Sequence, residues 1–371
     1  MRITTNAILR NYKSNLGTSL SNLDFARTRV MTQRKFNSTA EDPSSALRAA
    51  VLQRKYARNE DYRTLVQDVQ SFQDSQEDAA MQINNLAKTL SKQYGLEALN
   101  GTNGSRETRE TYAAAWRGAQ ESMVLSLNAS YEGKYVFAGS DGLEAPFKLT
   151  KVKDGKLGTE GKQVLLYRNV DVTTGELYDK DGNLVTANNA NSAASCEQRL
   201  KELSEDTLFV DLGFGLTINE TGTGTTTAKE VIDPSSVFNT SLPGINVVGF
   251  GVNKETGNPN NMIILMGQIA DKLNESEFDY EGYRKLLGEF DEGRDKVLEQ
   301  VTTLGTQTEF LTTTKDRLDT SMINLSTQID NVVNIDMAEA IMNFSWAQYA
   351  YNAALKVGNN ILTPSFIDFM R

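Results

Sequence analysis

The residues that could do chemistry fall into a few small groups. They are the acidic neighbours Glu41-Asp42 and Asp291-Glu292, the single cysteine Cys196, and the glycine pairs Gly213-x-Gly215 and Gly222-x-Gly224. Two close carboxyls can act as acid and base, a thiolate can act as a nucleophile, and a glycine-rich loop can hold phosphate. Each of these uses needs further residues, which the sequence either supplies or lacks.

The partners that these groups need are missing from the sequence. The chain has no histidine, so Cys196 has no imidazole to activate it, and one cysteine allows neither an intrachain disulfide nor a cysteine zinc cluster. Neither glycine pair continues with a third glycine or with Lys-Ser/Thr, so both predict turns. Asp179-x-Asp181-Gly182 resembles the start of a calcium loop but lacks the downstream bidentate glutamate, and the piece 176–186 predicts a hairpin.

Both acidic pairs have a structural explanation. Glu41-Asp42 directly precedes Pro43 and a helical run, where negative charge and N-capping stabilise a helix start. Asp291-Glu292 falls on a predicted helix, where charges normally form a solvated face. We therefore expect no catalytic residue, no cofactor and no metal site, and we predict that the protein is not an enzyme.

The bulk composition excludes further classes of function. Lys and Arg total 38 and Asp and Glu total 48 in 371 residues, and a net charge of −10 argues against binding nucleic acid. No stretch of eighteen apolar residues is present, so no membrane insertion is expected. The start, MRITTNAILRNYKSNL, has no apolar core of a secretory signal. The protein is expected either to stay in the cytoplasm or to be exported without cleavage of such a signal.

Two long stretches, 44–145 and 260–363, contain no proline and are free to form uninterrupted helices. Apolar residues recur there at alternating steps of three and four from Leu65 to Leu90, interrupted at Gln76, and from Tyr283 to Val332, interrupted at Arg294, Thr308 and Lys315. The second run predicts one helix of about 75 Å at 1.5 Å per residue, or else two shorter bundle helices that share a phase. A further helix at 112–127 follows the breakers at 100–104, which predicts an antiparallel helical hairpin.

The composition changes between residues 133 and 257, which hold sixteen of the 27 glycines. The spacing of apolar residues drops there to two, or gives way to short runs rich in β-forming residues, as in β-strands. Residues 193–203 favour a short helix. The expected strands are Lys134–Phe137, Gln163–Tyr167, Thr207–Leu212 and Leu216–Ile218. The sequence thus predicts a mainly α protein with an inserted β-rich domain, whose long antiparallel helical bundle or coiled-coil rod comes from both halves of the chain.

Each end of the chain carries a narrow apolar seam on an otherwise polar helix. Such a seam is too thin to form a core alone, so the two ends are expected to pair within one subunit, with neighbours, or both. We predict that these seams form an assembly interface. Its residues are Leu9, Tyr12, Leu16, Leu23, Val30, Met337, Ile341, Phe344, Tyr351 and Leu355.

Three stretches carry a resemblance to a known family. They are Met1–Thr4 continuing to the run NSTAEDPSSA at 37–46, the run GKYVFAGS at 133–140 with Pro146-Phe147 after it, and the end from AQYAYNAAL at 347–355 to SFIDFMR at 365–371. Together they resemble the flagellin-related axial proteins of the bacterial flagellum. Within this family they are most similar to the hook-associated protein 3 branch, the hook–filament junction proteins. Flagellin itself usually continues its first motif with Asp-Asp-Ala-Ala-Gly-Leu, whereas Pro43-Ser44-Ser45 follows Asp42 here.

The resemblance implies a structural subunit, exported through the flagellar type III apparatus with an export chaperone and placed in the extracellular flagellum. Its partners would be further copies of itself, hook-associated protein 1 and flagellin. It implies terminal coiled coils at 1–42 and 335–371, a helical body at 43–140 and 260–334, and an inserted β-rich outer domain at 141–259. Alternatives are a flagellin, or a flagellin-like protein whose insertion acts as an adhesin or as a carboxylate enzyme.

Overall fold

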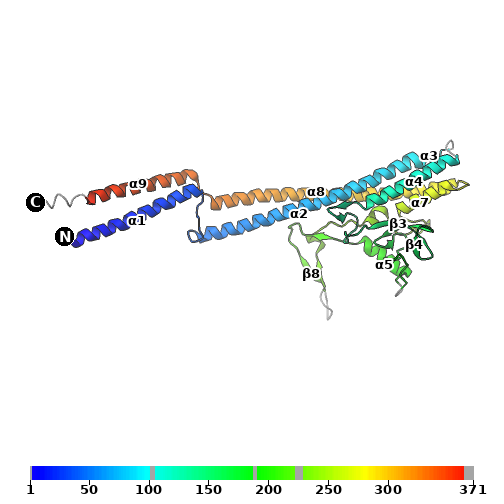
Figure 1. The fold of residues 1–371 in the computed structure, drawn as a ribbon, viewed down its shortest axis with the longest axis horizontal. Coiled ribbons are helices and arrows are strands. Elements are labelled where there is room, and N and C mark those ends of the chain that lie inside the picture. The colour runs from blue at the N-terminus through cyan, green and yellow to red at the C-terminus, as the bar shows by residue number, and fades with distance from the viewer. Residues whose placement is uncertain (1, 101–104, 187–189, 222–228, 363–371) are drawn as a thin grey trace. The chain divides into compact units, whose positions relative to one another are not determined.

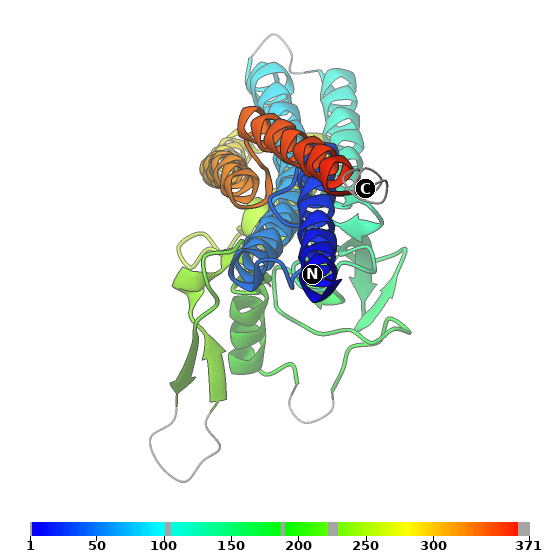
Figure 2. The same cartoon turned by 90° about the vertical axis from the view of Figure 1, so that its left-hand side faces the viewer.

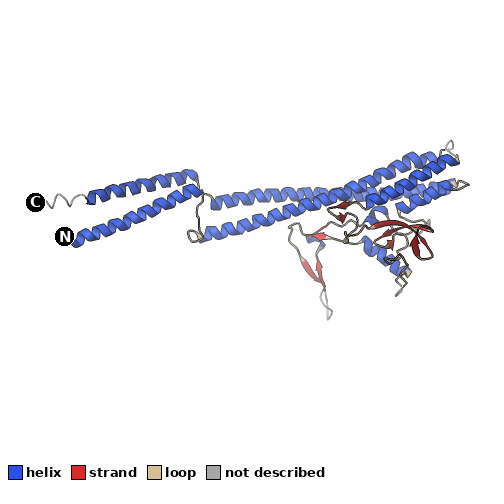
Figure 3. Ribbon diagram, in the orientation of Figure 1, coloured by secondary structure: helices blue, strands red, loops and turns tan. Residues whose placement is uncertain are grey.

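The computed structural model describes residues 2–100, 105–186, 190–221 and 229–362. It is mainly helical with a small antiparallel β part, which confirms the predicted fold class (Figure 3). The helices are α1 (Arg2–Thr32), α2 (Pro43–Thr89), a π-helical turn (Leu90–Gly95), α3 (Leu96–Ala98), α4 (Arg106–Leu127), α5 (Ala193–Ser204), α6 (Gly244–Val248), α7 (Met262–Asn274), α8 (Tyr280–Val333) and α9 (Met337–Leu362). A 3-10 turn lies at Pro234–Ser236.

The strands are short and lie between α4 and α6 in sequence. They are β1 (Ser130–Tyr131), β2 (Lys134–Tyr135), β3 (Phe147–Lys153), β4 (Lys156–Gly158), β5 (Lys162–Tyr167), β6 (Val170–Asp171), β7 (Phe209–Val210), β8 (Ile218–Thr221), β9 (Lys229–Ile232) and β10 (Phe238–Asn239). The largest described sheet has the order β4-β3-β5-β6, and all of its pairs are antiparallel.

The apolar repeat from Tyr283 to Val332 predicted a single long helix, and α8 is one helix of 54 residues. Helix α5 and strand β5 also lie where the sequence placed them. Of the other strand predictions, two were too long and the third lay too early in the sequence. Strand β2 ends at Tyr135, because the chain turns at once and Gly139 takes a φ of +73°. Only residues 209–210 pair in the 207–212 stretch, and β8 begins where the 216–218 prediction ended.

The chain divides into two compact units. Unit 1 comprises Met1–Arg63 with Arg317–Arg371, and unit 2 comprises Thr64–Asp316. Each unit therefore draws on both halves of the helical sequence, because α2 and α8 contribute to both. The finer division into three parts stays a prediction.

The core of unit 2 lies where α4 and α7 pack beside α8 and one face of β5. Trp116 of α4 is fully buried and meets Phe290 of α8 edge to face, with 4.9 Å between the ring centroids. Strand β5 is buried on both faces, because Leu165 and Tyr167 join this core while Val164 and Leu166 pack against Tyr178. The sheet is thus covered by helices on one side and by the 176–184 hairpin on the other.

Unit 1 contains the helix pair α1 and α9, which lie side by side (Figures 1 and 2). A short antiparallel link joins the end of α1 to the segment before α9. In it Lys35 N–H donates to Val333 O at 2.8 Å, and Ile335 N–H donates to Gln33 O at 3.0 Å. The Lys35 ammonium adds a bond to Asn331 O at 2.6 Å. Helix α9 thus starts beside the end of α1, and the two helices run antiparallel.

Candidate assembly interface

The predicted seam of α1 faces α9. Leu9, Tyr12, Leu16, Leu23 and Val30 are all half-buried, whereas the residues between them are mostly exposed. This alternation follows the heptad spacing, because a helix turns the residues at steps of three and four toward the same partner. The sequence therefore identified the face of α1 that makes the contact within one copy.

On α9 the inward face differs slightly from the predicted seam. Met337, Phe344 and Tyr351 are half-buried, as the spacing required, but Ile341 and Leu355 keep 50% and 43% of their surface exposed. Small residues take the positions closest to α1. Ala340 is buried with 2% exposed, and Gly358 is also buried. Ile341 and Leu355 lie beside the contact with α1 and face solvent in a single copy.

One polar contact fixes how the two helices meet at the far end of the pair. The Tyr12 hydroxyl donates to Ala354 O at 3.2 Å, a bond that spans 342 residues of sequence. The Tyr12 ring lies directly against Gly358, where an added Cβ would overlap its hydroxyl. A glycine at 358 therefore lets the tyrosine reach the backbone of α9.

The seam is not fully buried in one copy. None of the ten predicted interface residues falls among the buried side chains of the described chain. A pair of helices can cover only one face of each helix, so the remaining apolar surface stays in water. The predicted residues therefore retain surface that a neighbouring molecule could cover.

A second apolar row on α9 was missed by the sequence analysis. Met342, Trp346, Tyr349 and Val357 expose 57%, 72%, 72% and 53% of their surface. Their spacing of four, three and eight residues places them on one row of the helix, away from α1. The same 3–4 spacing that located the first seam would have found this outer row. A helix that is apolar on two opposite faces needs two partners.

A groove lies between α1 and α9. It has a volume of about 280 Å³ and is lined by Asn22, Phe25, Ala26, Arg29, Ile335, Ala340, Asn343 and Ala347. The Arg29 guanidinium lies 4.0 Å from the centre of the Phe25 ring, and the Phe25 side chain is 41% exposed. The alanines make the groove, because small side chains leave space between two packed helices.

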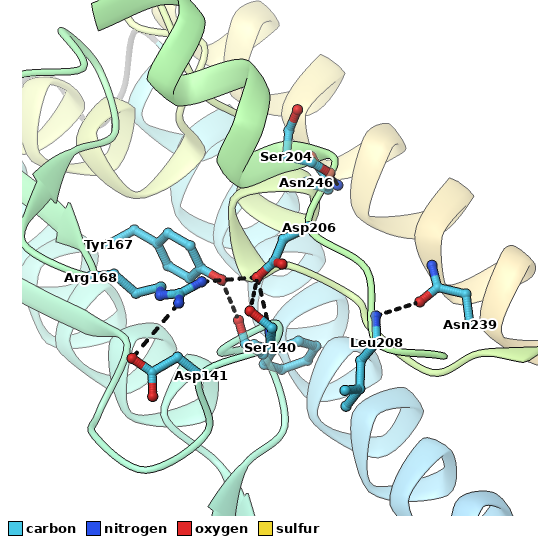
Figure 4. Close-up of polar contacts among 10 residues, drawn as sticks. Ser140, Asp141, Tyr167, Arg168, Ser204, Asp206, Leu208, Asn239 and Asn246 are labelled. Atoms are coloured by element: carbon cyan, nitrogen blue, oxygen red, sulfur yellow. Dashed lines mark hydrogen bonds and ion pairs between the residues drawn. The ribbon is translucent and has the colours of Figure 1, made fainter. Parts of the chain in front are cut away.

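Ser140, the last residue of the GKYVFAGS stretch in the resemblance, binds the Asp206 carboxylate in unit 2 (Figure 4). One Asp206 carboxylate oxygen accepts from the Ser140 backbone N–H at 2.9 Å, from the Ser140 hydroxyl at 2.8 Å and from Arg168 at 2.9 Å. Asp141 lies 3.7 Å from the other terminal nitrogen of Arg168. This network ties the loop after β2 to the β5–β6 turn and to the end of α5.

Tyr167 and Asp171 are among the buried groups of this unit whose pKa is shifted. Burial raises the pKa of the Tyr167 hydroxyl, which donates to Phe137 O at 3.1 Å, so the phenol stays neutral. Burial also raises the pKa of Asp171, although its carboxylate accepts from the Thr173 N–H at 2.8 Å. Both groups are held by hydrogen bonds inside the unit, and their contacts stabilise turns.

The candidate chemical groups have structural roles. Asp42 accepts from the Ser45 N–H at 3.0 Å at the start of α2, which confirms the predicted cap. Asp179 accepts from the Asn183 N–H at 2.8 Å in the expected hairpin turn. Gly213 and Gly215 both have positive φ, and the chain bends at Gly213, as predicted for a turn. Gly222 and Gly224 lie outside the described residues.

The second acidic pair and the cysteine also have partners. Asp291 pairs with Arg294 at 3.1 Å on α8, and Glu292 is exposed. Cys196 is buried on α5, with its sulfur 3.9 Å from the Asn191 side-chain oxygen. No group of three metal-ligating side chains comes together within the described ranges. Among the helices that the structure describes, none combines the length and apolar character that a membrane span requires.

The described part of the β-rich insertion has an open cleft of about 720 Å³ beside α5 and another of about 650 Å³ whose lining includes Asp141, Glu144 and Arg168. The cleft beside α5 is lined by the acids Glu176 and Glu197, and none of these four acids is buried. Glu197 is 80% exposed and lies 3.9 Å from the Lys254 ammonium. These acids are solvated, so their surroundings do not separate their roles as an acid and base pair requires.

Comparison with known proteins gives a partial sequence match and a shared fold. Residues 3–141 match the family described as the bacterial flagellin N-terminal helical region. No curated protein sequence matches the chain. The structure of a putative flagellar hook-associated protein from Vibrio parahaemolyticus has a TM-score of 0.51 at 12% identity, covering 79% of this chain and 100% of that one. These matches confirm the resemblance to flagellin-related axial proteins, and the structural match shows a common fold.

Two further solved structures are similar at lower scores. FlgL of Bacillus cereus has a TM-score of 0.46 at 14% identity, with 76% of this chain and 99% of that chain covered. The flagellar hook-associated protein 3 of Legionella pneumophila has a TM-score of 0.45 at 14% identity, with 76% and 98% covered.

Proposed function

We propose that this chain is a structural subunit of the bacterial flagellum that joins the hook to the flagellin filament by polymerising through its terminal helices. The observation that carries this proposal is the half-covered pair of α1 and α9. Its seam stays partly in water and its outer row on α9 is largely exposed. A surface of this kind on a helix pair at both ends of a chain is typical of a protein that completes its packing in an assembly.

The energetics favour coupling between assembly and ordering of the ends. Fixing a residue of backbone costs about 1–2 kcal/mol, and an isolated helix pair recovers little of this. Burying a large apolar side chain returns about 1.5–3 kcal/mol. Neighbouring copies that cover Trp346, Tyr349 and Met342 would therefore offset part of the ordering entropy of α9, and the seam residues that they also cover would add to this.

The parts of the chain then take different positions in the polymer. Residues 1–42 with 335–371 would form the inner wall, 43–140 with 260–334 the helical body, and 141–259 the outer domain. The partners would be other copies of this chain, hook-associated protein 1 on the hook side, and flagellin on the filament side. An export chaperone and the type III export apparatus would carry the chain to the extracellular flagellum without a cleaved signal.

The junction assignment is supported by the hook-associated proteins among the structures that share this fold and by the Pro43-Ser44-Ser45 departure from the flagellin motif. It is tested by deleting the gene from a motile strain. Such cells are expected to keep their hooks and to release flagellin monomers into the medium, because filaments have no junction on which to grow.

The control is complementation in the same cells. The full chain should restore filaments, and a chain without residues 341–371 should not. Loss of the hook, or a normal filament in the absence of this protein, would reject the junction role.

A further inference from the structure

The groove between α1 and α9 is built to receive a side chain. Its lining includes the small residues Ala26, Ala340 and Ala347 together with Phe25 and Arg29. A cavity of about 150 Å³ already accommodates a benzene-sized molecule. The 280 Å³ of this groove therefore leaves room for a larger aromatic ring.

The chain itself carries a group that matches the groove. Trp346 is 72% exposed in the middle of the outer row, between Met342 and Tyr349. It cannot fill the groove of its own copy. It adjoins Ala347 in sequence, so the two side chains point about 100° apart around the helix.

We propose that Trp346 of one copy inserts into the α1–α9 groove of a second copy. This inference rests on the proposed function, because it names the contact through which the terminal helices polymerise. The indole would pack on the alanines that line the groove, and Met342 and Tyr349 of the same copy as the indole would cover its edges. Tryptophan at the centre of a contact surrounded by such residues is the usual composition of an interface hot spot.

The polar groups of the groove suit an indole. The Arg29 guanidinium already lies over one aromatic ring, at 4.0 Å from the centre of Phe25, and a second ring on its other face adds a further cation–π contact. The amides of Asn22 and Asn343 line the groove and supply carbonyl oxygens for the indole N–H. An aliphatic side chain would satisfy neither group.

The contact has a direction. We call the Trp346 side chain the knob. It lies on the outer row of α9, whereas the groove lies on the side of α9 that meets α1, so the surfaces that meet are different on the two copies. A contact between unlike surfaces leaves Trp346 free at one end and the groove free at the other end of every open oligomer. Growth then continues into a ring or a helical polymer, as an axial subunit requires, and does not stop at a twofold dimer.

The experiment uses the purified full chain and measures the concentration above which it assembles, by light scattering and sedimentation. Trp346→Ala removes the knob, and Asn343→Phe places a ring in the groove from an exposed position. Each is expected to raise the critical concentration by about tenfold or more, as for the loss of an interface hot spot. The matched controls are Leu125→Ala, at a side chain that is 74% exposed on α4, and Asn352→Phe, on a different row of α9.

Mixing the two variants tests the direction of the contact. Trp346→Ala keeps an open groove and Asn343→Phe keeps a knob, so an equimolar mixture should form a one-to-one dimer at concentrations where each alone is monomeric. Circular dichroism and thermal unfolding of each variant should match the wild type, because both positions are exposed in one copy.

The outcomes separate the two proposals. If the wild type assembles and either variant assembles equally well, the knob and groove are rejected while assembly through the terminal helices stands. A mixture that gives no heterodimer rejects the directed contact. If the wild type does not assemble at any concentration, and removal of residues 341–371 changes nothing, both the inference and the proposed function fail.

Discussion

At the scale of single residues, Asp206 shows how one carboxylate can hold distant parts of a chain. Ser140 lies 66 residues before it and Arg168 lies 38 residues before it, yet all three meet at one oxygen (Figure 4). Hydrogen bonds to a charged acceptor are stronger than neutral ones, and a half-buried guanidinium needs such a partner. Arg168 and Asn169 also take positive φ values in the two-residue β5–β6 turn, so the network holds a strained hairpin in place.

Gly139 is required by this network. Its φ is +73°, and a Cβ at this position would lie 2.5 Å from the Asp206 carboxylate oxygen. Gly139→Ala is expected to lower the free energy of unfolding by about 2–4 kcal/mol, from left-handed strain and from displacement of Asp206. Chemical denaturation of the full chain measures this.

Gly133→Ala is the matched control, because Gly133 has a φ of +80° with open space around its Cβ. It should cost only about 1 kcal/mol of strain. Equal costs for the two variants would show that Asp206 does not constrain residue 139.

Removing the carboxylate tests the same site from the other side. Asp206→Ala leaves the Ser140 N–H and the Arg168 guanidinium without their acceptor, at a side chain that is only 19% exposed. The expected loss is about 2–4 kcal/mol of unfolding free energy. Glu160→Ala breaks the exposed pair of Lys153 and Glu160 and should change stability by less than about 1 kcal/mol. A variant of Asp206 as stable as that control contradicts the role assigned to it.

At the scale of elements, the polar residue that interrupts the first long apolar run is buried in unit 2, close to a second buried glutamine. Gln76 is fully buried on α2 and donates to Val136 O at 2.7 Å. Gln73, also on α2, donates to Gln307 of α8 at 2.8 Å. Such polar pairs favour one register of two helices over shifted ones, because a slip would leave the amides unpaired. The sequence showed that Gln76 interrupts the first apolar run, and the structure showed that its partner is the Val136 carbonyl.

The start of α2 is sensitive to acid. The Ser45 hydroxyl, the Ser45 N–H and the Ser44 hydroxyl lower the pKa of Asp42 from its ordinary value of 3.8 to about 2. A lowered pKa in the folded state means that the contribution to stability is complete above the unfolded pKa and is lost as the pH falls toward the folded one. Between pH 3.8 and about 2 the wild type should therefore lose stability that depends on Asp42.

The measurement is the denaturation midpoint as a function of pH for the wild type and for Asp42→Asn. The variant cannot titrate at this position, so its midpoint should fall less steeply through the same window. Parallel curves for the two proteins would mean that Asp42 does not couple the start of α2 to pH.

At the scale of the whole molecule, the main core is independent of the chain ends. Every buried member of that core lies between Ala79 and Val301, within unit 2. Deleting residues 1–30 or 341–371 is therefore expected to leave a folded, monomeric protein whose unit 2 melts within a few degrees of the full chain. Calorimetry and sedimentation velocity check this, and a deletion that unfolds unit 2 would contradict it.

Hydrogen exchange on the dilute full-length monomer gives the companion test. Amides of α1 and α9 should exchange much faster than those of α4 and α7, because the half-buried pair has little packing to protect it. Addition of preassembled polymer should slow exchange in α1 and α9. Rigid, protected ends in the isolated monomer would remove the physical basis for coupling assembly to ordering.

The sequence alone determined the periodic features of this protein. Heptad spacing identified the long helix α8 and the inward face of α1, the prolines marked where helices could run, and Asp42 before Pro43 identified a cap. These features follow from local geometry, since a helix repeats every 3.6 residues and its first turn needs acceptors. The sequence also showed that Cys196 has no histidine to activate it and that the phosphate-loop and calcium-loop patterns are incomplete.

Only the tertiary structure decided which surfaces remain uncovered. Trp346 and Ala347 are neighbours in sequence, but one faces solvent and the other lines the groove because α1 packs on a single side of α9. The partnership of Asp206 with Ser140 and Arg168 likewise depends on how the chain folds back on itself. Contacts between residues far apart in sequence have no local period, so they are fixed by packing of the whole unit.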